Sequence, residues 1–188
     1  MSPAEDAVHD SQHMDDPVGS TITYEHFVDE AVRDEGARGF MCRSREHEAI
    51  VATQLFRMAR RKVEIVTRTL DGPLFHDDHV LQAMYDFLVG GRDRHIHVLV
   101  EDNLNSYEVS IWRSLRESVS PRQVIIERLD PSHRGMYAGN FILVDDSSYL
   151  FRVRREPIAS LVGIRDLAGG QRIKSLFARL VVQQEAAA

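Results

Sequence analysis

Few residues of this 188-residue chain stand in an arrangement that could do chemistry, and the clearest are two groups of histidines. His76-Asp77-Asp78-His79 places four possible metal ligands in a row, but consecutive residues do not converge on one ion unless the chain folds back. The same run is a good first turn for a helix, where carboxylates meet the positive end of the dipole. His95 and His97 share one face of a predicted strand and lack a third ligand. We therefore expect neither a metal nor another cofactor.

Arginines offer a different chemistry, the binding of anions. Arg152 and Arg154 lie two apart on a predicted strand, so they share a face. Guanidinium groups pair with phosphate without any reaction, but the two could equally be solvated charges on a sheet edge. A second basic cluster follows a predicted helix and consists of Arg57, Arg60, Arg61 and Lys62. Cations suit that end of a helix, so this cluster needs no ligand to explain it.

Motifs of the common enzyme classes are missing from the sequence. It contains no Gly-rich phosphate loop, no G-x-S-x-G and no H-E-x-x-H. The single cysteine, Cys42, excludes an internal disulfide framework and a site with several thiolate ligands. With 43% hydrophobic and 28% charged residues, the composition is that of an ordinary soluble globular protein. No segment resembles a membrane span or a signal peptide, so we expect a cytoplasmic protein.

The charge of the chain is divided unevenly. Residues 1–40 hold ten acidic and two basic residues, a net charge of −8, whereas residues 41–188 hold 19 acidic and 21 basic residues, a net charge of +2. The overall charge of −6 therefore argues neither for nor against a nucleic-acid partner. We expect residues 1–19 to form a disordered acidic tail, residues 20–43 an N-terminal docking segment with a short helix, and residues 44–188 one α/β domain.

The elements that must position these side chains follow from apolar periodicity. Residues 138–155 predict a buried strand that turns at Asp145-Asp146-Ser147-Ser148 and returns beside itself. Further strands are predicted at residues 63–67, 95–100, 123–129 and 158–164. Helices are predicted after the N-cap Ser44, from about Asp77, over residues 105–118, and after Gly169-Gly170. The alternation predicts an α/β fold with a mixed β-sheet flanked by helices.

The order of these elements, from about Ser44 to Gln184, resembles one half of the phospholipase D superfamily. Residues 59–65 are similar to the entry into the first strand of that superfamily, and residues 91–100 resemble its Arg-Gly-Val-x-Val strand. The stretch Thr67-Arg68-Thr69-Leu70-Asp71 resembles a smaller family of bacterial phospholipase D-like domains of unknown function. The catalytic motif of the superfamily is a His, one residue, a Lys, four residues and an Asp. Aligning that Asp on Asp145 places the His on Ala138 and the Lys on Asn140.

The resemblance implies a single phospholipase D-like half whose catalytic residues are lost. Alanine can be neither nucleophile nor acid, and asparagine carries no charge to hold a phosphate. The downstream Gly-Ser-x-Asn of the superfamily is also absent, since it falls on Arg152, Val153 and Arg155. We therefore expect a non-catalytic pseudoenzyme that serves as a dimeric scaffold or binds an anion or nucleic acid. Because members with two motif copies pair their halves, a homodimer is expected.

Two sets of site residues follow from this resemblance. The candidates for binding a ligand are Arg68, Asn140, Asp145, Arg152 and Arg154. The alternative is an active phosphodiesterase or nuclease that uses a displaced histidine, with His133 and Asp145 as its candidates. The two differ in whether any imidazole approaches Asn140 and Asp145 in the folded protein.

Overall fold

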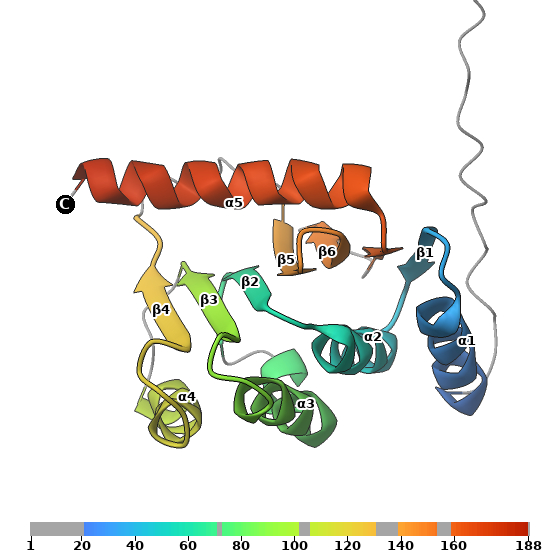
Figure 1. Cartoon of the computed structure of the whole chain (residues 1–188), viewed down its shortest axis with the longest axis horizontal. Coiled ribbons are helices and arrows are strands. Elements are labelled where there is room, and N and C mark those ends of the chain that lie inside the picture. Colours follow the sequence, from blue (N-terminus) through green and yellow to red (C-terminus); the bar gives the residue numbers. More distant parts are fainter. Residues whose placement is uncertain (1–20, 71–72, 102–105, 131–138, 154–158, 188) are drawn as a thin grey trace, which may run out of the picture.

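The structure is a computed structural model that describes residues 21–70, 73–101, 106–130, 139–153 and 159–187. The predicted tail at residues 1–19, together with His133, Ala138, Arg154 and Arg155, lies outside the described residues. The described part forms a seven-stranded sheet in the order β1-β7-β6-β5-β2-β3-β4 (Figure 1). Its strands are β1 Arg38–Cys42, β2 Lys62–Thr67, β3 His95–Val100, β4 Val124–Arg128, β5 Gly139–Val144, β6 Ser148–Val153 and β7 Ser160–Ile164.

The sheet is mixed, as the sequence predicts. Strands β2, β3 and β4 run parallel, and β5 joins them antiparallel to β2. Strands β5, β6, β7 and β1 are antiparallel to one another in succession. The turn between β5 and β6 holds Asp145 and Asp146 at φ 46° and 64°, the left-handed region that hairpin turns require. The predicted hairpin is thereby confirmed.

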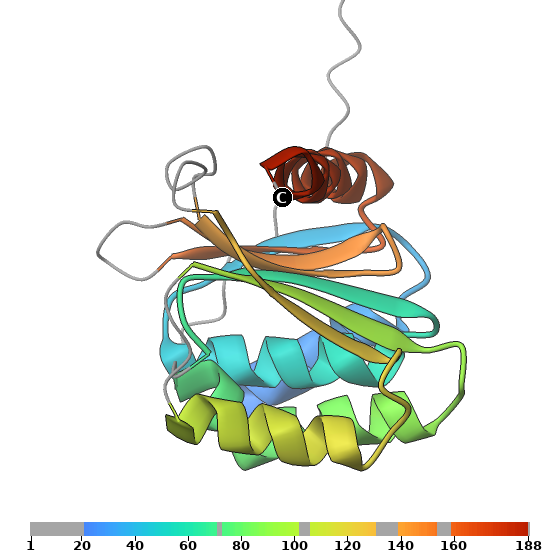
Figure 2. The same ribbon diagram turned by 90° about the vertical axis from the view of Figure 1, so that its left-hand side faces the viewer.

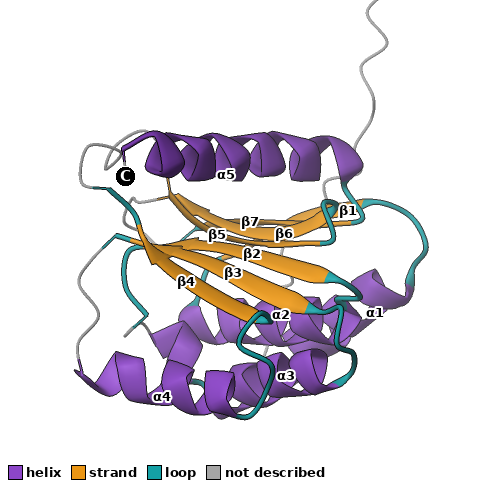
Figure 3. Cartoon of the chain, turned by 60° about the vertical axis from the view of Figure 1, so that its left-hand side comes forward, coloured by secondary structure: helices purple, strands orange, loops and turns teal. Residues whose placement is uncertain are grey.

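Helices cover both faces of the sheet. Figures 2 and 3 show α5, Leu167–Ala187, on one face and the other four helices on the opposite face. Those four are α1 Thr21–Arg33, α2 Arg45–Met58, α3 Asp78–Val89 and α4 Ser106–Glu117, and a 3-10 turn, η1, spans Pro73–His76. Strand β5 alternates between two cores, with Ile142 in the core toward α2 and Phe141 in the core toward α5. The predicted burial of this strand on both faces is therefore confirmed.

Local capping explains where two of the helices begin. The hydroxyl of Ser44 accepts the N–H of His47 at 3.1 Å at the start of α2. The carboxylate of Asp77 accepts the N–H groups of His79 and Val80 at the start of α3. The predicted helix start at about Asp77 is confirmed, since Asp77 satisfies two N–H groups that have no partner within the helix, whereas His76 belongs to the preceding η1 turn.

Residues 21–42 carry the predicted helix and one strand that the sequence did not predict. Helix α1 buries Tyr24 and Val28 completely. Residues 38–42 form β1, which pairs antiparallel with β7 at the edge of the sheet. A five-residue strand that contains Gly39 and begins with Arg38 has a poor strand pattern of its own. Residues 38–42 are extended because they pair with β7.

The last helix begins earlier than the sequence predicts. Gly169 and Gly170 do not precede α5 but lie in its first turn, where a side chain would collide with the β5–β6 hairpin. A Cβ on Gly170 would lie 2.2 Å from the carbonyl oxygen of Asp146, and one on Gly169 would lie 2.4 Å from the hydroxyl of Tyr149. The glycines permit a close approach of helix and hairpin and do not end a loop. None of the helices in the described part of the chain is long and apolar enough to cross a membrane.

Candidate functional site

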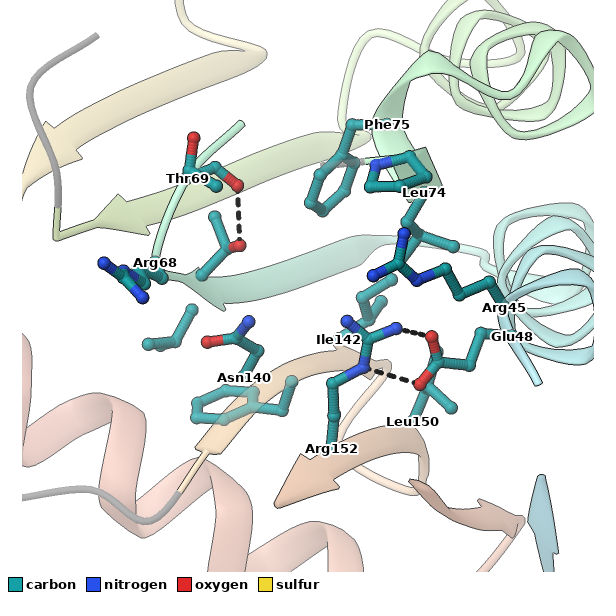
Figure 4. Close-up of a pocket in the computed structure, with 14 residues that line it drawn as sticks. Arg45, Glu48, Arg68, Thr69, Leu74, Phe75, Asn140, Ile142, Leu150 and Arg152 are labelled. Carbon is teal, nitrogen blue, oxygen red and sulfur yellow. Dashed lines mark hydrogen bonds and ion pairs between the residues drawn. The ribbon is translucent and has the colours of Figure 1, made fainter. Parts of the chain in front are cut away.

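A cavity of about 360 Å³ opens where β2 ends and α2 begins, beside the start of β5 and the end of β6 (Figure 4). Ligands of α/β proteins commonly bind at the carboxyl ends of parallel strands, and β2 is such a strand. Four elements contribute polar side chains, namely Arg45 and Glu48 from α2, Thr67 to Thr69 from the end of β2, Asn140 from β5 and Arg152 from β6. Val66, Pro73, Leu74, Phe75, Phe141, Ile142 and Leu150 complete the wall.

The charge of this cavity is positive. Three of its described lining residues, Arg45, Arg68 and Arg152, are arginines, and Glu48 is the one carboxylate among them. Arg45 is exposed, and its side chain has no hydrogen bond or ion pair with another described residue. Guanidinium groups stay charged at any pH in the physiological range and present several N–H donors to an anion. The cavity can therefore bind an anion.

Arg152 is held in place by Glu48. The Glu48 side chain is 1% exposed, and its Oε1 accepts the Nε of Arg152 at 2.7 Å. Its second oxygen pairs with Nη2 of the same guanidinium group, and the buried hydroxyl of Ser160 donates to Oε1. Figure 4 shows this two-point pairing at the wall of the cavity. A carboxylate this deeply buried needs such partners, so Glu48 orients Arg152.

Asn140 lies opposite Arg152 in the β5–β6 pairing and points into the cavity (Figure 4). Its amide oxygen is buried and accepts no hydrogen bond from the described residues. Buried polar atoms normally have partners, so this amide has spare capacity for a ligand. An amide can turn either its oxygen or its N–H₂ group toward that ligand.

The turn after β2 carries Arg68. The hydroxyl of Thr67 donates to the carbonyl oxygen of Thr69 at 2.9 Å and thereby closes the turn. Arg68 is exposed between them and lines the cavity. Three of the sequence-predicted binding residues, Arg68, Asn140 and Arg152, are therefore brought together in one place.

Asp145 lies elsewhere. It follows the last residue of β5, five residues from Asn140, which corresponds to about 17 Å along a strand. Its carboxylate accepts the backbone N–H of Arg60 at 2.7 Å and those of Arg61 and Lys62 at 3.0 Å. Asp145 thus connects the hairpin to the α2–β2 loop. The other two candidates, His133 and Arg154, lie outside the described residues.

The remaining histidine pair has ordinary surroundings. His97 lies 3.1 Å from a carboxylate oxygen of Glu127, and its ring packs edge-on against Phe177 of α5 at 5.1 Å. Trp112 is 2% exposed and belongs to the core. In the described ranges no three His, Cys, Asp or Glu side chains are grouped so that they could hold a metal ion.

Sequence reasoning missed two residues of the cavity, Arg45 and Glu48. Glu48 lies in the first turn of the helix that the sequence predicts after Ser44, where the dipole favours a carboxylate. A sharper signal was available, because Glu48 precedes Val51, Ala52 and Leu55 at helical spacing and so stands on the buried stripe of α2. A charge on an apolar stripe predicts a buried partner.

The sequence matches one family model, Domain of unknown function (DUF7931), over residues 44–181. The chain belongs to this family. The match covers all elements from α2 to the larger part of α5, so the cavity is built mainly from residues inside the DUF7931 domain. No curated protein matches the sequence.

Solved structures resemble this DUF7931 protein in fold. TrmBL2, an archaeal chromatin protein, has a TM-score of 0.54 and 12% identity over 86% of this chain and 60% of its own. Nuc from Salmonella typhimurium, a phospholipase D family member, has a TM-score of 0.55 and 7% identity over 79% of this chain and 95% of its own. NucT from Helicobacter pylori has a TM-score of 0.53 and 15% identity over 78% of this chain and 95% of its own.

These likenesses confirm the phospholipase D-like α/β fold that the sequence predicts. Identities of 7 to 15% concern the fold alone. The chain spans about 60% of the length of TrmBL2 and nearly all of Nuc and NucT. In this DUF7931 protein the function must accordingly be argued from its own side chains.

Proposed function

We propose that the protein is a non-catalytic phospholipase D-like module that binds phosphodiester groups of nucleic acid in the cavity around Asn140. The observation that carries this proposal is the placement of Arg45, Arg68 and Arg152 around Asn140, with Glu48 as the one opposing carboxylate. Asn140 stands at the position that the superfamily gives to its phosphate-binding lysine. The arginines supply the charge that asparagine lacks.

Binding without hydrolysis is supported by the composition of the cavity. Covalent phosphodiester chemistry needs a nucleophile with a neighbouring base. The described residues that line the cavity include no histidine, cysteine, serine or lysine. The hydroxyl of Thr67 is engaged with a backbone carbonyl. Ala138 stands at the nucleophile position in the sequence. These side chains suit the recognition of a phosphate and leave its bonds intact.

A nucleic acid is favoured over a simple anion because the cavity is only partly polar. Leu74, Phe75 and Phe141 provide an apolar wall beside the arginines, against which a sugar or base can pack. A chain of phosphates also gains from several arginines at once. TrmBL2, one of the similar structures, is described as binding DNA, which agrees with this proposal at the level of fold.

The test is fluorescence anisotropy with labelled single-stranded and duplex oligonucleotides at several salt concentrations. Arg45→Ala and Arg68→Ala should each weaken binding and lower the slope of log K against log[salt] by about one. Arg116→Ala, at an exposed position of α4, is the matched control and should change neither the affinity nor the salt dependence. Binding that Arg45→Ala and Arg68→Ala leave unchanged would contradict the assignment to this cavity.

Activity is tested separately with a generic phosphodiester such as bis(4-nitrophenyl) phosphate. We expect no turnover above the protein-free rate. Turnover that His133→Ala abolishes would replace the non-catalytic proposal with the displaced-histidine enzyme.

A homodimer is the second part of the proposal. Exposed apolar residues support it, since Leu161 is 40%, Leu167 63% and Val182 62% exposed, on β7 and α5. Sedimentation should give twice the chain mass of 21.4 kDa at micromolar concentration. A single species at the mass of one chain would exclude the dimeric scaffold and would leave the binding proposal unaffected.

A further inference from the structure

A second, larger cavity lies at the hairpin end of β5, whereas Asn140 lies at the other end of this strand. It has a volume of about 620 Å³ and is formed where α2 ends, β2 and β3 begin, and the β5–β6 hairpin turns. Four arginines line it, namely Arg57, Arg60, Arg94 and Arg165. The other lining residues are Met58, Ala59, Val144, Asp145, Ser147 and Ser148. The proposed nucleic-acid site uses none of these residues.

Two of the four guanidinium groups are anchored by backbone carbonyls. Arg94 donates from Nη1 to the carbonyl of Phe87 at 3.1 Å, and its guanidinium carbon lies 5.6 Å from the centre of the Phe87 ring. Arg165 donates from Nη2 to the carbonyl of Val32 at 2.8 Å and from Nη1 to the carbonyl of Asp34. Carbonyls and ring faces position a cation without neutralising it. Both groups therefore stay charged and in place.

Arg57 and Arg60 have no such anchors. Both side chains are exposed, and neither makes a hydrogen bond or ion pair with another residue in the described part of the chain. They were explained above by the dipole of α2, which favours cations at this end of the helix. The dipole explains why cations are favourable at this position, but it does not explain why Arg57 and Arg60 line the same cavity as Arg94 and Arg165.

The opposing negative charge at this cavity is small. Asp145 is the one carboxylate among the described lining residues, and its oxygens already accept three backbone N–H groups. The C-terminal end of α2 adds about half a negative charge. Four guanidinium groups exceed both together, so the cavity attracts an anion with several charges.

We propose that this second cavity binds a chain of adjacent phosphates, as in inorganic polyphosphate or the triphosphate of a nucleotide. Several guanidinium groups around one hollow suit a ligand that concentrates several charges, each phosphate pairing with a planar fork of N–H donors. The apolar residues among the described lining are Met58, Ala59 and Val144, and none of them carries an aromatic ring on which a base could stack. The site therefore recognises the phosphates and not the base.

The test is isothermal titration calorimetry of the full chain with tripolyphosphate, ATP, GTP and orthophosphate at physiological salt. Tripolyphosphate, ATP and GTP should bind with affinities within about threefold of one another, and orthophosphate at least about tenfold more weakly. Arg57→Ala and Arg60→Ala should each lower the affinity for tripolyphosphate by about tenfold, because each removes charge-assisted hydrogen bonds. Arg60→Lys keeps the positive charge but loses the planar set of N–H donors, so its affinity for tripolyphosphate should lie between those of wild type and Arg60→Ala.

The control is Arg68→Ala, which changes the cavity around Asn140 and should leave the affinity of the second cavity for tripolyphosphate unchanged. Conversely, Arg57→Ala combined with Arg60→Ala should leave oligonucleotide binding at the first cavity unchanged, which separates this inference from the proposed function. No saturable binding of tripolyphosphate at millimolar concentration would overturn the proposal. An equal loss in Arg68→Ala, or a clear preference for one nucleotide base, would overturn it as well.

Discussion

Glu48 of α2 and Arg152 of β6 stand 104 positions apart in the sequence, and their side chains meet in a two-point ion pair at the wall of the first cavity. Glu48 is almost fully buried, whereas the side chain of Arg152 remains 32% exposed. Ser160 of β7 donates a further hydrogen bond to Glu48. The pair therefore fastens α2 to the antiparallel half of the sheet and holds Arg152 at the wall of the cavity.

Removing the two partners should have unequal effects on stability. Arg152→Ala leaves a buried carboxylate without its counter-charge and should lower the free energy of unfolding by about 3–5 kcal/mol. Glu48→Gln leaves a guanidinium group that water can reach, and should lower it by about 1.5–3 kcal/mol. Urea unfolding monitored by circular dichroism measures both. Arg45 lines the same cavity and pairs with no other described residue, so Arg45→Ala should change stability by less than about 0.5 kcal/mol. Equal losses for the first two variants would contradict the buried-charge explanation.

Gly170→Ala should destabilise the protein although alanine is the better helix former. The added Cβ would lie 2.2 Å from the carbonyl oxygen of Asp146, so α5 or the hairpin must move. Such overpacking typically costs about 1–3 kcal/mol, more than the gain of up to about 1 kcal/mol in helix propensity. Thermal unfolding gives the difference. Gly39→Ala is the control, because its Cβ would have only one close neighbour, at 3.9 Å. A Gly170→Ala variant as stable as wild type would show that the contact relaxes easily.

Asp145 should prove to be a structural residue of the hairpin and not a ligand of the first cavity. Asp145→Ala removes the acceptor of three backbone N–H groups and places alanine at φ 46°, so we expect a loss of about 2 kcal/mol or more. Asp145→Asn keeps one oxygen and tolerates positive φ, so it should lose less. Neither change should alter oligonucleotide affinity while the protein is folded. Loss of oligonucleotide binding in a folded Asp145→Asn variant would show that Asp145 takes part in binding.

Asp146 should make the stability of the protein sensitive to acid. Its carboxylate lies 2.6 Å from Nζ of Lys174 on α5 and 2.7 Å from Nζ of Lys62 on β2. Burial alone would raise the pKa of Asp146, but the two ammonium groups outweigh it and hold the pKa below its usual value. A carboxyl group with a lowered pKa stabilises the fold above its unfolded pKa of about 3.9, and this contribution is lost as pH falls through the folded value.

The measurement is the free energy of unfolding of wild type and Asp146→Asn between pH 3 and pH 7. Because both pairs are partly exposed, the difference should be about 1 kcal/mol, constant above about pH 5 and shrinking below about pH 4. A difference that stays constant down to pH 3 would show that the charge of Asp146 contributes nothing.

The fold could largely be predicted from local patterns in the chain. The run Phe141 to Val144 predicts a strand buried on both faces, and the four polar residues after it predict the hairpin turn. The helix starts at Ser44 and Asp77 were also predictable, because capping depends on residues within one turn. The exceptions are β1 and the start of α5. Strand β1 depends on pairing with β7. Gly169 and Gly170 allow α5 to pack closely against the β5–β6 hairpin, which lies about 20 residues earlier in the chain.

The site was predictable only in part, and the reason is the range of the interactions. Arg68 and Asn140 were predicted from motif alignments, because a resemblance maps positions along the chain, and Arg152 was predicted from the strand spacing that places it on one face with Arg154. The partnership of Glu48 with Arg152 and the anchoring of the Asp145 carboxylate on the α2–β2 loop depend on which elements lie side by side. By itself the sequence determined most of the strands and helices and the type of fold, and it places Ala138 and Asn140 where the alignment on Asp145 predicts the superfamily's His and Lys. Only the tertiary structure decided which charges are buried, which are paired and which line a cavity, because burial and ion pairing join residues through space and leave no periodic trace along the chain.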